Sequence, residues 1–417
     1  MEFIREKIKE KPISRKRVFQ QLAVAVLCGI LFAVTACMVL LLCMPMLQNA
    51  LLSGVPMDTQ QESSSQGTED SESETETGSS EKPDLPDIIP EFSLTLEDYQ
   101  ELQDKLYAVG KSANNAVVAI TSVVNEEGGM NQAYGTEGQG CGVIVSEDSN
   151  YYYVLTEKHV IQDASRVHIT FVDGMGAEAA VLKHDGNTGV TILAVEKRQI
   201  SEETSEDIAV ITFGNSYAVG NGAIVIAIGN PLGDPFSILT GNVTSNTKEV
   251  ATLDKNYDIY TTNIIASENG GGFLLNTKGE LVGMVFQSFQ ETQGMNTLTA
   301  VSISEINGVV QRLIQGKDMP YVGLQVSTVT KQLSTAHNLP MGVFIKEVMT
   351  DSPAMFAGLQ SGDIITHING EDVYSDATYS SKIQMLLPGT TCEITVRRQN
   401  GDSYMEIKCV VQLGVLQ

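Results

Sequence analysis

An uncharged, apolar stretch near the N-terminus limits what this chain can fold into more than any other feature. Residues 22–54 carry no charged side chain, and residues 22–47 are almost entirely apolar. About 20 such residues let a helix cross the hydrocarbon core of a bilayer. Residues 1–21 hold seven Lys or Arg against three Glu, and a basic flank of this kind stays in the cytoplasm. We therefore expect a cytoplasmic segment at 1–21, a transmembrane signal anchor at 22–47 and an extracytoplasmic remainder.

Two other interpretations of this stretch remain open. A cleaved signal peptide has a shorter apolar region followed by a cleavage site with small residues, and the sequence shows neither. Lipidation of Cys37 would fit residues 34–37, which resemble a lipobox, but the apolar stretch continues beyond that cysteine to residue 47. The uncleaved anchor is the interpretation that we favour.

Residues 48–92 are expected to form an acidic, disordered linker. Within them, residues 55–90 hold ten Asp or Glu, one Lys and almost nothing that a core could bury. Low hydrophobicity with high like charge favours disorder, and a flexible coil of this length spans roughly 30–36 Å. The simplest interpretation is a solvated stalk, and a specific acidic binding tail is the alternative.

The charge of the whole chain excludes one broad class of partner. Lys and Arg number 26 against 51 Asp and Glu, which gives a formal net charge of −25, and Trp is absent. Neither a basic surface for phosphates nor an aromatic platform for bases is available, so we expect no nucleic-acid partner. The 37 glycines cluster among Val and Ile in the middle of the chain, which is typical of β-rich domains with tight turns.

Two folded blocks are expected after the linker, at 93–316 and 319–412. In the first block, Thr95 can cap a helix whose Tyr99, Leu102 and Leu106 share one face. Short runs of β-forming residues separated by Gly, Asn and Asp then predict an all-β sandwich or barrel. These predicted strands include 117–123, 142–145, 152–156, 167–172, 223–228 and 281–286.

The second block mixes strands with a helix. Strands are predicted at 342–348 and 363–368, and a helix at 376–387 ends before Pro388-Gly389. A hairpin with strands 391–398 and 403–411 follows around Asn400-Gly401, a strong signal for a two-residue turn.

Two cysteines lie in that predicted hairpin. Pairing across Asn400-Gly401 places Cys392 opposite Cys409, where side chains approach closely. A disulfide can then form outside the cytoplasm, and two buried free thiols are an equal alternative.

Several motifs, taken in order, resemble those of the HtrA (DegP-like) family of trypsin-fold serine proteases. Residues 152–161 (YYVLTEKHVI) look like the strand and turn that carry the catalytic histidine of this family. Further segments are similar to its other motifs, and the second block resembles a PDZ domain. The family-like segments are 227–233 (AIGNPLG), 240–245 (TGNVTS) and 261–284, and the PDZ-like ones are 351–354, 357–359, 362–365 and 368–370. The resemblance implies a mainly β fold, in which a trypsin-like double β-barrel is followed by an α+β PDZ domain.

This resemblance implies a Ser-His-Asp triad, but two of the three positions lack the side chain that the reaction needs. His159 matches the base. The acid position falls on Gly189 in an ungapped match, or on Ile192 with a gap, and neither has a carboxylate. Gly270 stands where the family has its nucleophilic serine. We therefore expect a catalytically degenerate member of the family.

The oxyanion-hole position is also altered. Glu268 replaces the glycine whose backbone N–H helps to form the hole, and a carboxylate there opposes the negative charge that the hole stabilises. An active site rearranged around Ser267 is the alternative, and it would have to rebuild both the histidine contact and the oxyanion hole. Asp185 could orient His159, but orientation serves no reaction without an attacking group.

The remaining candidates point to no metal or cofactor. Cys141 lies where the family commonly has serine, and we interpret it as a small packed residue. His168 fits a strand surface. His184, His337 and His367 show no metal-ligand spacing.

The PDZ-like block keeps its ligand-binding pattern. Residues 321–324 (Tyr321, Val322, Gly323 and Leu324) resemble the carboxylate-binding loop of HtrA-type PDZ domains. Leu324 and Val326 begin the strand that receives a C-terminal peptide, and the helix from Asp376 walls the groove. The alternative is that these residues only pack the domain core.

The sequence therefore predicts a membrane-anchored, extracytoplasmic HtrA-like pseudoprotease of a bacterial cell. It would bind unfolded polypeptides or protein C-termini in protein quality control, as an adaptor or sensor. The alternative is an active serine endopeptidase with a rearranged site. Since HtrA proteases generally form trimers, the resemblance also implies a homotrimer or co-assembly with an active relative.

Overall fold

The computed structural model describes residues 94–124, 135–267, 270–286, 289, 297–401 and 403–416. The predicted cytoplasmic segment, signal anchor and acidic linker lie outside these ranges. Within the described ranges, no helix combines the length and apolar character that crossing a bilayer requires.

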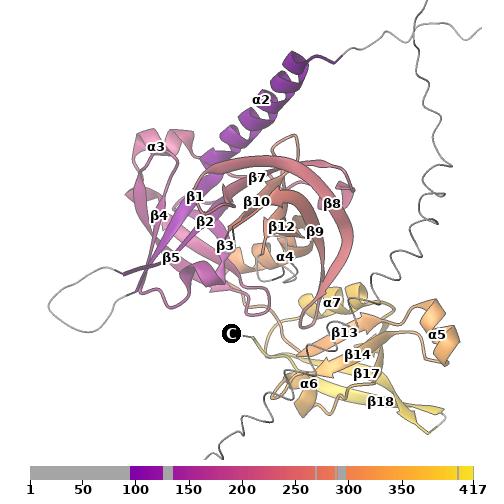
Figure 1. Ribbon diagram of the computed structural model, residues 1–417. Coiled ribbons are helices and arrows are strands. Elements are labelled where there is room, and N and C mark those ends of the chain that lie inside the picture. Colours follow the sequence, from indigo (N-terminus) through magenta and orange to yellow (C-terminus); the bar gives the residue numbers. More distant parts are fainter. Residues whose placement is uncertain are drawn as a thin grey trace, which may run out of the picture. The chain divides into compact units, whose positions relative to one another are not determined.

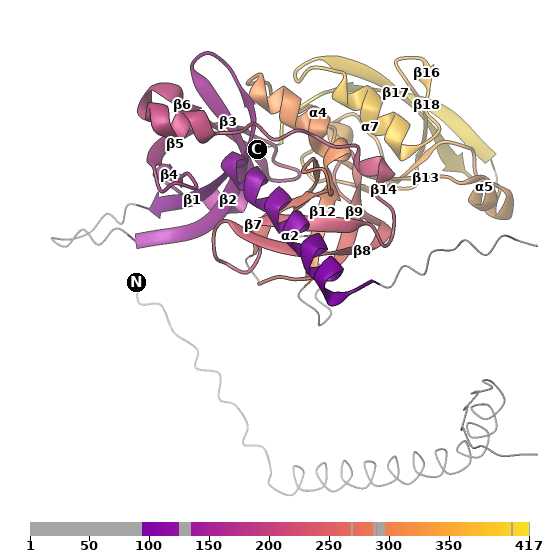
Figure 2. The ribbon, with the colours of Figure 1, turned by 90° about the horizontal axis from the view of Figure 1, so that it is seen from above.

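The first helix begins where its capping residues predict. Thr95 caps α2 (Leu96–Ala113) through a capping box with Asp98, so that each side chain accepts a hydrogen bond from the other's backbone N–H. Leu106 of the expected apolar face is buried, but Tyr99 and Leu102 are 61% and 44% exposed. Only the C-terminal part of α2 is buried, where Gly110 lies against Ile226 and Ile238 of the barrel strands β7 and β8 described below (Figures 1 and 2).

Residues 117–196 form a closed, six-stranded antiparallel barrel in the order β1-β2-β3-β6-β5-β4. Alternating apolar side chains fill its interior, among them Ile120, Val154 and Leu193. The strands are β1 (Val117–Val124), β2 (Gly135–Glu147), β3 (Tyr151–Glu157), β4 (Arg166–Thr170), β5 (Gly176–His184) and β6 (Val190–Glu196).

A second closed barrel follows in the order β10-β11-β12-β9-β8-β7. Its strands are β7 (Ile224–Asn230), β8 (Ser237–Ala251), β9 (Asn256–Ile265), β10 (Gly271–Leu275), β11 (Leu281–Val285) and β12 (Thr297–Ser302). The short helix α3 (Glu202–Asp207) lies between the barrels in sequence, and α4 (Ile303–Ile314) follows the second. The 3-10 helices whose full bounds are described in this part are η1 (Asn114–Ala116), η2 (Lys158–Ile161), η3 (Lys197–Gln199) and η4 (Ser216–Ala218).

One hydrophobic cluster joins the two barrels. It includes Val143 and Ile192 of the first barrel and Phe273 of the second, together with the buried face of α4. Because α4 contacts β5 and β6 as well as β11 and β12, the helix ties the barrels together. The predicted double barrel is confirmed (Figure 1).

The C-terminal block is a sheet in the order β13-β14-β15-β17-β18, with β16 paired to β15. Its core centres on the buried Tyr379 and Ile394. The strands are β13 (Leu324–Thr328), β14 (Val343–Val348), β15 (Ile364–Ile368), β16 (Glu371–Asp372), β17 (Thr391–Asn400) and β18 (Ser403–Gln412). The helices are α5 (Lys331–His337), α6 (Pro353–Phe356) and α7 (Asp376–Gln384). The expected α+β PDZ architecture is confirmed.

The register of the last hairpin corrects one prediction. Asn400 pairs with Ser403, so Cys392 lies opposite Val411, and Cys409 lies opposite Ile394. The turn begins one residue later than predicted, at Gly401, whose φ is +62°. This shift moves the pairing by two residues and separates the cysteines. Both thiols are free and buried, so the disulfide is wrong and the free-thiol alternative holds.

Candidate functional site

The expected base lies directly after a buried strand. β3 carries the chain into the 3-10 helix η2, which holds His159. The His159 side chain is about half exposed, and its Nδ1 lies 3.2 Å from Oε2 of the largely buried Glu157. The hydrogen bond with Glu157 raises the pKa of His159 above its ordinary value, while partial burial opposes the rise.

Glu157 is a residue that the sequence reasoning missed. The acid positions that the resemblance implies, Gly189 and Ile192, lie after the histidine in sequence, whereas Glu157 lies two residues before it. Glu157 ends β3 and His159 lies in η2, so strand alternation does not relate the two residues, and only their closeness in sequence could have suggested the pair. A carboxylate on Nδ1 holds a neutral imidazole with its proton on that nitrogen and leaves Nε2 as the basic one.

The expected acid position lies next to this pair but carries no side chain. A Cβ built on Gly189 would come within 3.9 Å of Cγ of Glu157. Its φ of +79° is a conformation that favours glycine. Ile192, the gapped candidate, lies buried within β6.

Asp185 is occupied within its own loop. Its carboxylate accepts hydrogen bonds from the Thr188 hydroxyl at 2.6 Å and from the Thr188 N–H at 3.1 Å. These bonds stabilise the turn before Gly189. The geometry gives Asp185 a loop-closing role in place of the orienting role considered for His159.

The expected nucleophile position is closed by backbone. The N–H groups of Ser267 and Gly270 donate to Pro231 O at 2.8 Å and to Ser267 O at 3.0 Å, respectively. A Cβ built on Gly270 would lie 2.1 Å from the carbonyl oxygen of Pro231. No side chain fits at position 270 unless this loop moves. The Ser267 hydroxyl lies 3.4 Å from the same carbonyl oxygen, and Glu268 lies outside the described residues.

The space beside His159 is very small. A cavity of about 10 Å³ is lined by His159, Glu157, Cys141, Asn230 and neighbouring residues, and one water molecule needs about that much. Cys141 is no substitute nucleophile there, because burial raises the pKa of its thiol to about 12 and the reactive form is the thiolate. Among the described residues that line this cavity there is no side-chain hydroxyl, and its one thiol is that of Cys141.

The expected carboxylate-binding loop does hold a carboxylate. The N–H groups of Val322, Gly323 and Leu324 donate to the side chain of Asp254 at 2.7, 2.9 and 3.1 Å. Gly323 has a φ of +93°, and successive N–H groups arranged in this way form an anion-binding nest. Tyr321 pairs through its backbone with Gly414. Asp254 belongs to the same chain, and the sequence reasoning did not find it.

Metal ligands do not gather in the described part of the chain, where no group of three or more His, Cys, Asp or Glu could hold an ion. His184 lies beside Lys158, 3.1 Å from its Nζ. His367 lies 3.0 Å from Asp372. His168 is exposed on β4, as expected of a strand-surface residue.

Comparison with known proteins agrees with this architecture. A family model for a trypsin-like peptidase domain matches residues 140–284, and one for a PDZ domain matches residues 344–398. Two solved HtrA structures share the fold. AlgW with a decapeptide aligns with 74% of this chain and 98% of its own at 21% identity and a TM-score of 0.54. A serine endoprotease from Yersinia pestis aligns with 75% and 98% at 24% identity and a TM-score of 0.52.

Similar sequences come from several bacteria. HhoB of Synechocystis sp. is 33% identical over 288 residues, which cover 65% of this chain and 66% of HhoB. The serine protease Do-like HtrB of Bacillus subtilis is 29% identical over 290 residues, which cover 62% of this chain and 61% of HtrB. The chain thus spans just under two thirds of the length of these relatives. With its trypsin-like double barrel and its PDZ domain, the chain belongs to the HtrA family.

Proposed function

We propose that this chain is a catalytically silent HtrA-family protein that binds polypeptides. One observation carries the proposal: the carbonyl oxygen of Pro231 lies where a side chain on Gly270 would begin. Acyl transfer on this fold needs a hydroxyl that the histidine can deprotonate. His159 and Glu157 could still move a proton, but at position 270 there is no hydroxyl for them to activate.

Peptide capture is the function that the remaining machinery supports. The nest at 322–324 binds a carboxylate through three N–H donors, and β13 is an edge strand of its sheet. A nest beside an open strand edge is how PDZ domains take C-terminal peptides. The AlgW structure, which contains a decapeptide, supports this assignment. The ligands we propose are unfolded polypeptides and protein C-termini.

Labelling with a serine-directed fluorophosphonate tests catalytic silence. The full chain is incubated with the probe and with unfolded casein, beside HtrB of Bacillus subtilis as a reference. We expect neither labelling nor cleavage by this chain. Labelling that disappears in Ser267→Ala but persists in Ser245→Ala, a control at a partly exposed serine of β8, would establish instead an endopeptidase with a rearranged site.

The cellular location is part of the proposal. The basic residues 1–21 and the apolar residues 22–47 support a single-pass anchor with both folded domains outside the cytoplasm. A relative from Pseudomonas fulva, 29% identical, is named as a periplasmic serine endoprotease. Added protease should digest the folded domains in intact spheroplasts, and deletion of residues 22–47 should move the chain to the soluble fraction. Protection of both domains would contradict this topology.

Assembly is the remaining proposal. A homotrimer, or mixed trimers with an active relative, would give a silent subunit a way to regulate proteolysis. Mass photometry of the full chain in detergent, alone and mixed with an active relative from the same organism, measures this directly. Monomers in both samples would contradict it.

A further inference from the structure

The turn between β8 and β9 enters the groove where a PDZ ligand would bind. Asp254 lies at the tip of this turn, and its carboxylate is held by the three N–H groups of the nest. The side chain thereby occupies the place of a peptide's terminal carboxylate. Asp254 is only 8% exposed, so its side chain is removed from water.

One backbone group and two side chains of the turn also contact the edge of β13. The Asp254 N–H donates to Leu324 O at 2.7 Å, while the Leu324 N–H donates to Oδ1 of Asp254 at 3.1 Å. Two residues further along, the Asn256 side chain contacts Val326 O at 3.4 Å. A peptide added as a strand to β13 would need these same groups.

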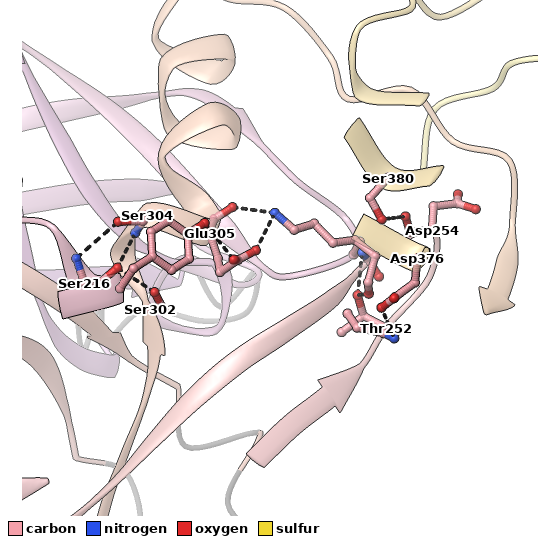
Figure 3. Close-up of polar contacts among 12 residues, drawn as sticks. Ser216, Thr252, Asp254, Ser302, Ser304, Glu305, Asp376 and Ser380 are labelled. Carbon is pink, nitrogen blue, oxygen red and sulfur yellow. Dashed lines mark hydrogen bonds and ion pairs between the residues drawn. The ribbon is translucent and has the colours of Figure 1, made fainter. Parts of the chain in front are cut away.

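The helix α7, which forms the opposite wall of the groove, also binds the turn. The Tyr379 hydroxyl donates to Oδ1 of Asp254 at 2.8 Å, and the Ser380 hydroxyl donates to Asp254 O at 2.7 Å. Asn256 donates to Oδ2 of Asp376 at 2.8 Å. Figure 3 shows Ser380 and Asp376 converging on the turn that carries Thr252 and Asp254. Both walls of the groove are therefore engaged by one five-residue segment, 252–256.

Contacts with the barrel domain stabilise the turn in this conformation. The Asn187 side chain accepts from Leu253 N at 3.0 Å and donates to Leu253 O at 2.7 Å. Lys255 forms an ion pair with Glu305 at 3.0 Å. Asp254 itself has a φ of +59°, a conformation that Asp and Asn adopt more readily than most residues. A ligand fixed in its bound shape loses little entropy on binding.

We propose that residues 252–256 are an internal ligand of the PDZ groove, and that a protein C-terminus binds there only by displacing Asp254. This inference rests on the proposed peptide binding by the same loop. Simple domain packing would require apolar contact or scattered polar pairs. It does not require a carboxylate centred on three consecutive N–H groups, with the backbone N–H of the same residue donating to the receiving strand.

Competition of this kind lowers the apparent affinity for external peptides. A tethered ligand acts at an effective concentration of about millimolar, and apparent affinity falls in proportion to the fraction of free grooves. Weak peptide binding by the intact chain is the expected resting state. Release of the turn would turn the same groove into a strong binding site.

Fluorescence anisotropy on the full chain tests the proposal. The probe is a fluorescein-labelled pool of random decapeptides with free C-termini, and the comparison pool is amidated. Asp254→Asn removes the charge but tolerates the left-handed conformation. Asp163→Asn is the matched control, because Asp163 also has a φ of +57° but is exposed in a turn of the first barrel. Hydrogen exchange at the amides of 322–324 is measured in the same samples without peptide.

We expect Asp254→Asn to bind the free-acid pool at least about tenfold more tightly than the unmodified chain, because a lost bond to a charged group is worth about that factor or more. Exchange at 322–324 should rise in this variant, and Asp163→Asn should change neither quantity. Amidated peptides should bind weakly to all forms.

The outcomes separate this inference from the proposed function. Equal peptide affinity and unchanged exchange in Asp254→Asn would overturn the internal ligand while leaving peptide capture intact. Faster exchange with no peptide binding by any form would uphold occupancy by Asp254 and contradict peptide capture. If Asp254→Asn unfolds, Tyr379→Phe removes one donor to the same carboxylate, and it should raise exchange at 322–324 in the folded chain.

Discussion

The two candidate sites of this chain are both closed from within, but they have lost different things. At the barrel site, Pro231 O fills the place of a side chain on Gly270, and the reacting group is gone. At the PDZ nest, every donor is present, and Asp254 of the same chain fills the place of a ligand. On the proposed function, the first closure leaves no nucleophile at position 270, whereas the second covers three N–H donors that could bind another anion.

This difference reflects what each kind of site is made of. Covalent catalysis depends on particular side chains at particular positions, so a single glycine abolishes it. The nest depends on backbone N–H groups in a fixed conformation, which many sequences can supply as long as Gly323 keeps its positive φ. We therefore propose that a site built from backbone groups is retained in a chain whose site built from side chains has lost its nucleophile.

The largest expected effect is that of Gly323→Ala, a substitution within the nest at 322–324. A Cβ at position 323 would lie 2.4 Å from Cβ of Ser352, at a φ of +93°. Left-handed strain and overpacking together should lower the free energy of unfolding by about 2–5 kcal/mol, measured by urea denaturation.

Gly362→Ala is the matched control for that variant. Gly362 has the same φ of +93°, but nothing lies within 4 Å of its Cβ position, so strain alone should cost about 1–2 kcal/mol. Equal losses in the two variants would mean that close packing at Gly323 does not shape the nest.

A serine restored at position 270 should not restore proteolysis. In Gly270→Ser the new Cβ overlaps Pro231 O, so we expect a loss of about 1–3 kcal/mol in unfolding free energy and no casein hydrolysis. Gly220→Ser is the control, since nothing lies within 4 Å of its Cβ position and its φ is not left-handed. Recovery of hydrolysis in Gly270→Ser would break the comparison, because the barrel closure would then be as reversible as that of the nest.

A smaller effect is expected from loosening the internal ligand. Ser380→Ala removes the hydrogen bond to Asp254 O, and a typical bond contributes about 0.5–1.5 kcal/mol. Peptide affinity in the anisotropy assay should therefore rise by roughly two- to tenfold. Ser381→Ala on the same helix is the control, because Ser381 is exposed. A rise of equal size in both variants would point to a general effect on α7.

The smallest expected effect concerns the pair formed by Glu157 and His159. Glu157 raises the pKa of His159, so Glu157→Gln should lower that pKa, as measured by NMR titration of the imidazole protons. The pair stabilises the fold fully below the ordinary histidine pKa of about 6.5, and this stabilisation is lost as pH rises through the higher folded pKa. The stability difference between the two forms should therefore shrink as pH rises.

Glu206→Gln is the control for the net-charge change, because Glu206 is exposed on α3. It should leave the titration of His159 in place. A histidine titration that is the same in all three forms would show that the Glu157 contact does not persist in solution.

Much of the fold followed from local rules. Thr95 with Asp98 marked the start of α2, and alternation with glycine punctuation marked the barrel strands. The register of the last hairpin did not follow from local rules. Its turn begins at Gly401, and a one-residue change in turn position moves the cross-strand pairing by two residues. Turn chemistry alone permits both registers, and packing on the sheet decides between them.

Some residues of the candidate sites also followed from local sequence patterns, and others did not. His159, Gly270 and the loop at 321–324 were found because their motifs are contiguous in sequence. Glu157 lies only two positions before His159, but strand periodicity does not relate them, because β3 ends at Glu157 and His159 lies in η2. Asp254 lies about 70 positions from the nest it fills, and no local pattern links a turn of one domain to a loop of another.

The sequence by itself determined that position 270 offers no hydroxyl, because a glycine carries none in any fold. It also determined that residues 321–324 can form an anion-binding loop. Only the tertiary structure decided that Pro231 O closes the nucleophile position and that Asp254 is the anion in the loop. The physical reason is that the presence of a functional group is a property of one residue, whereas occupancy of a site depends on which distant atoms the packed domains bring to it.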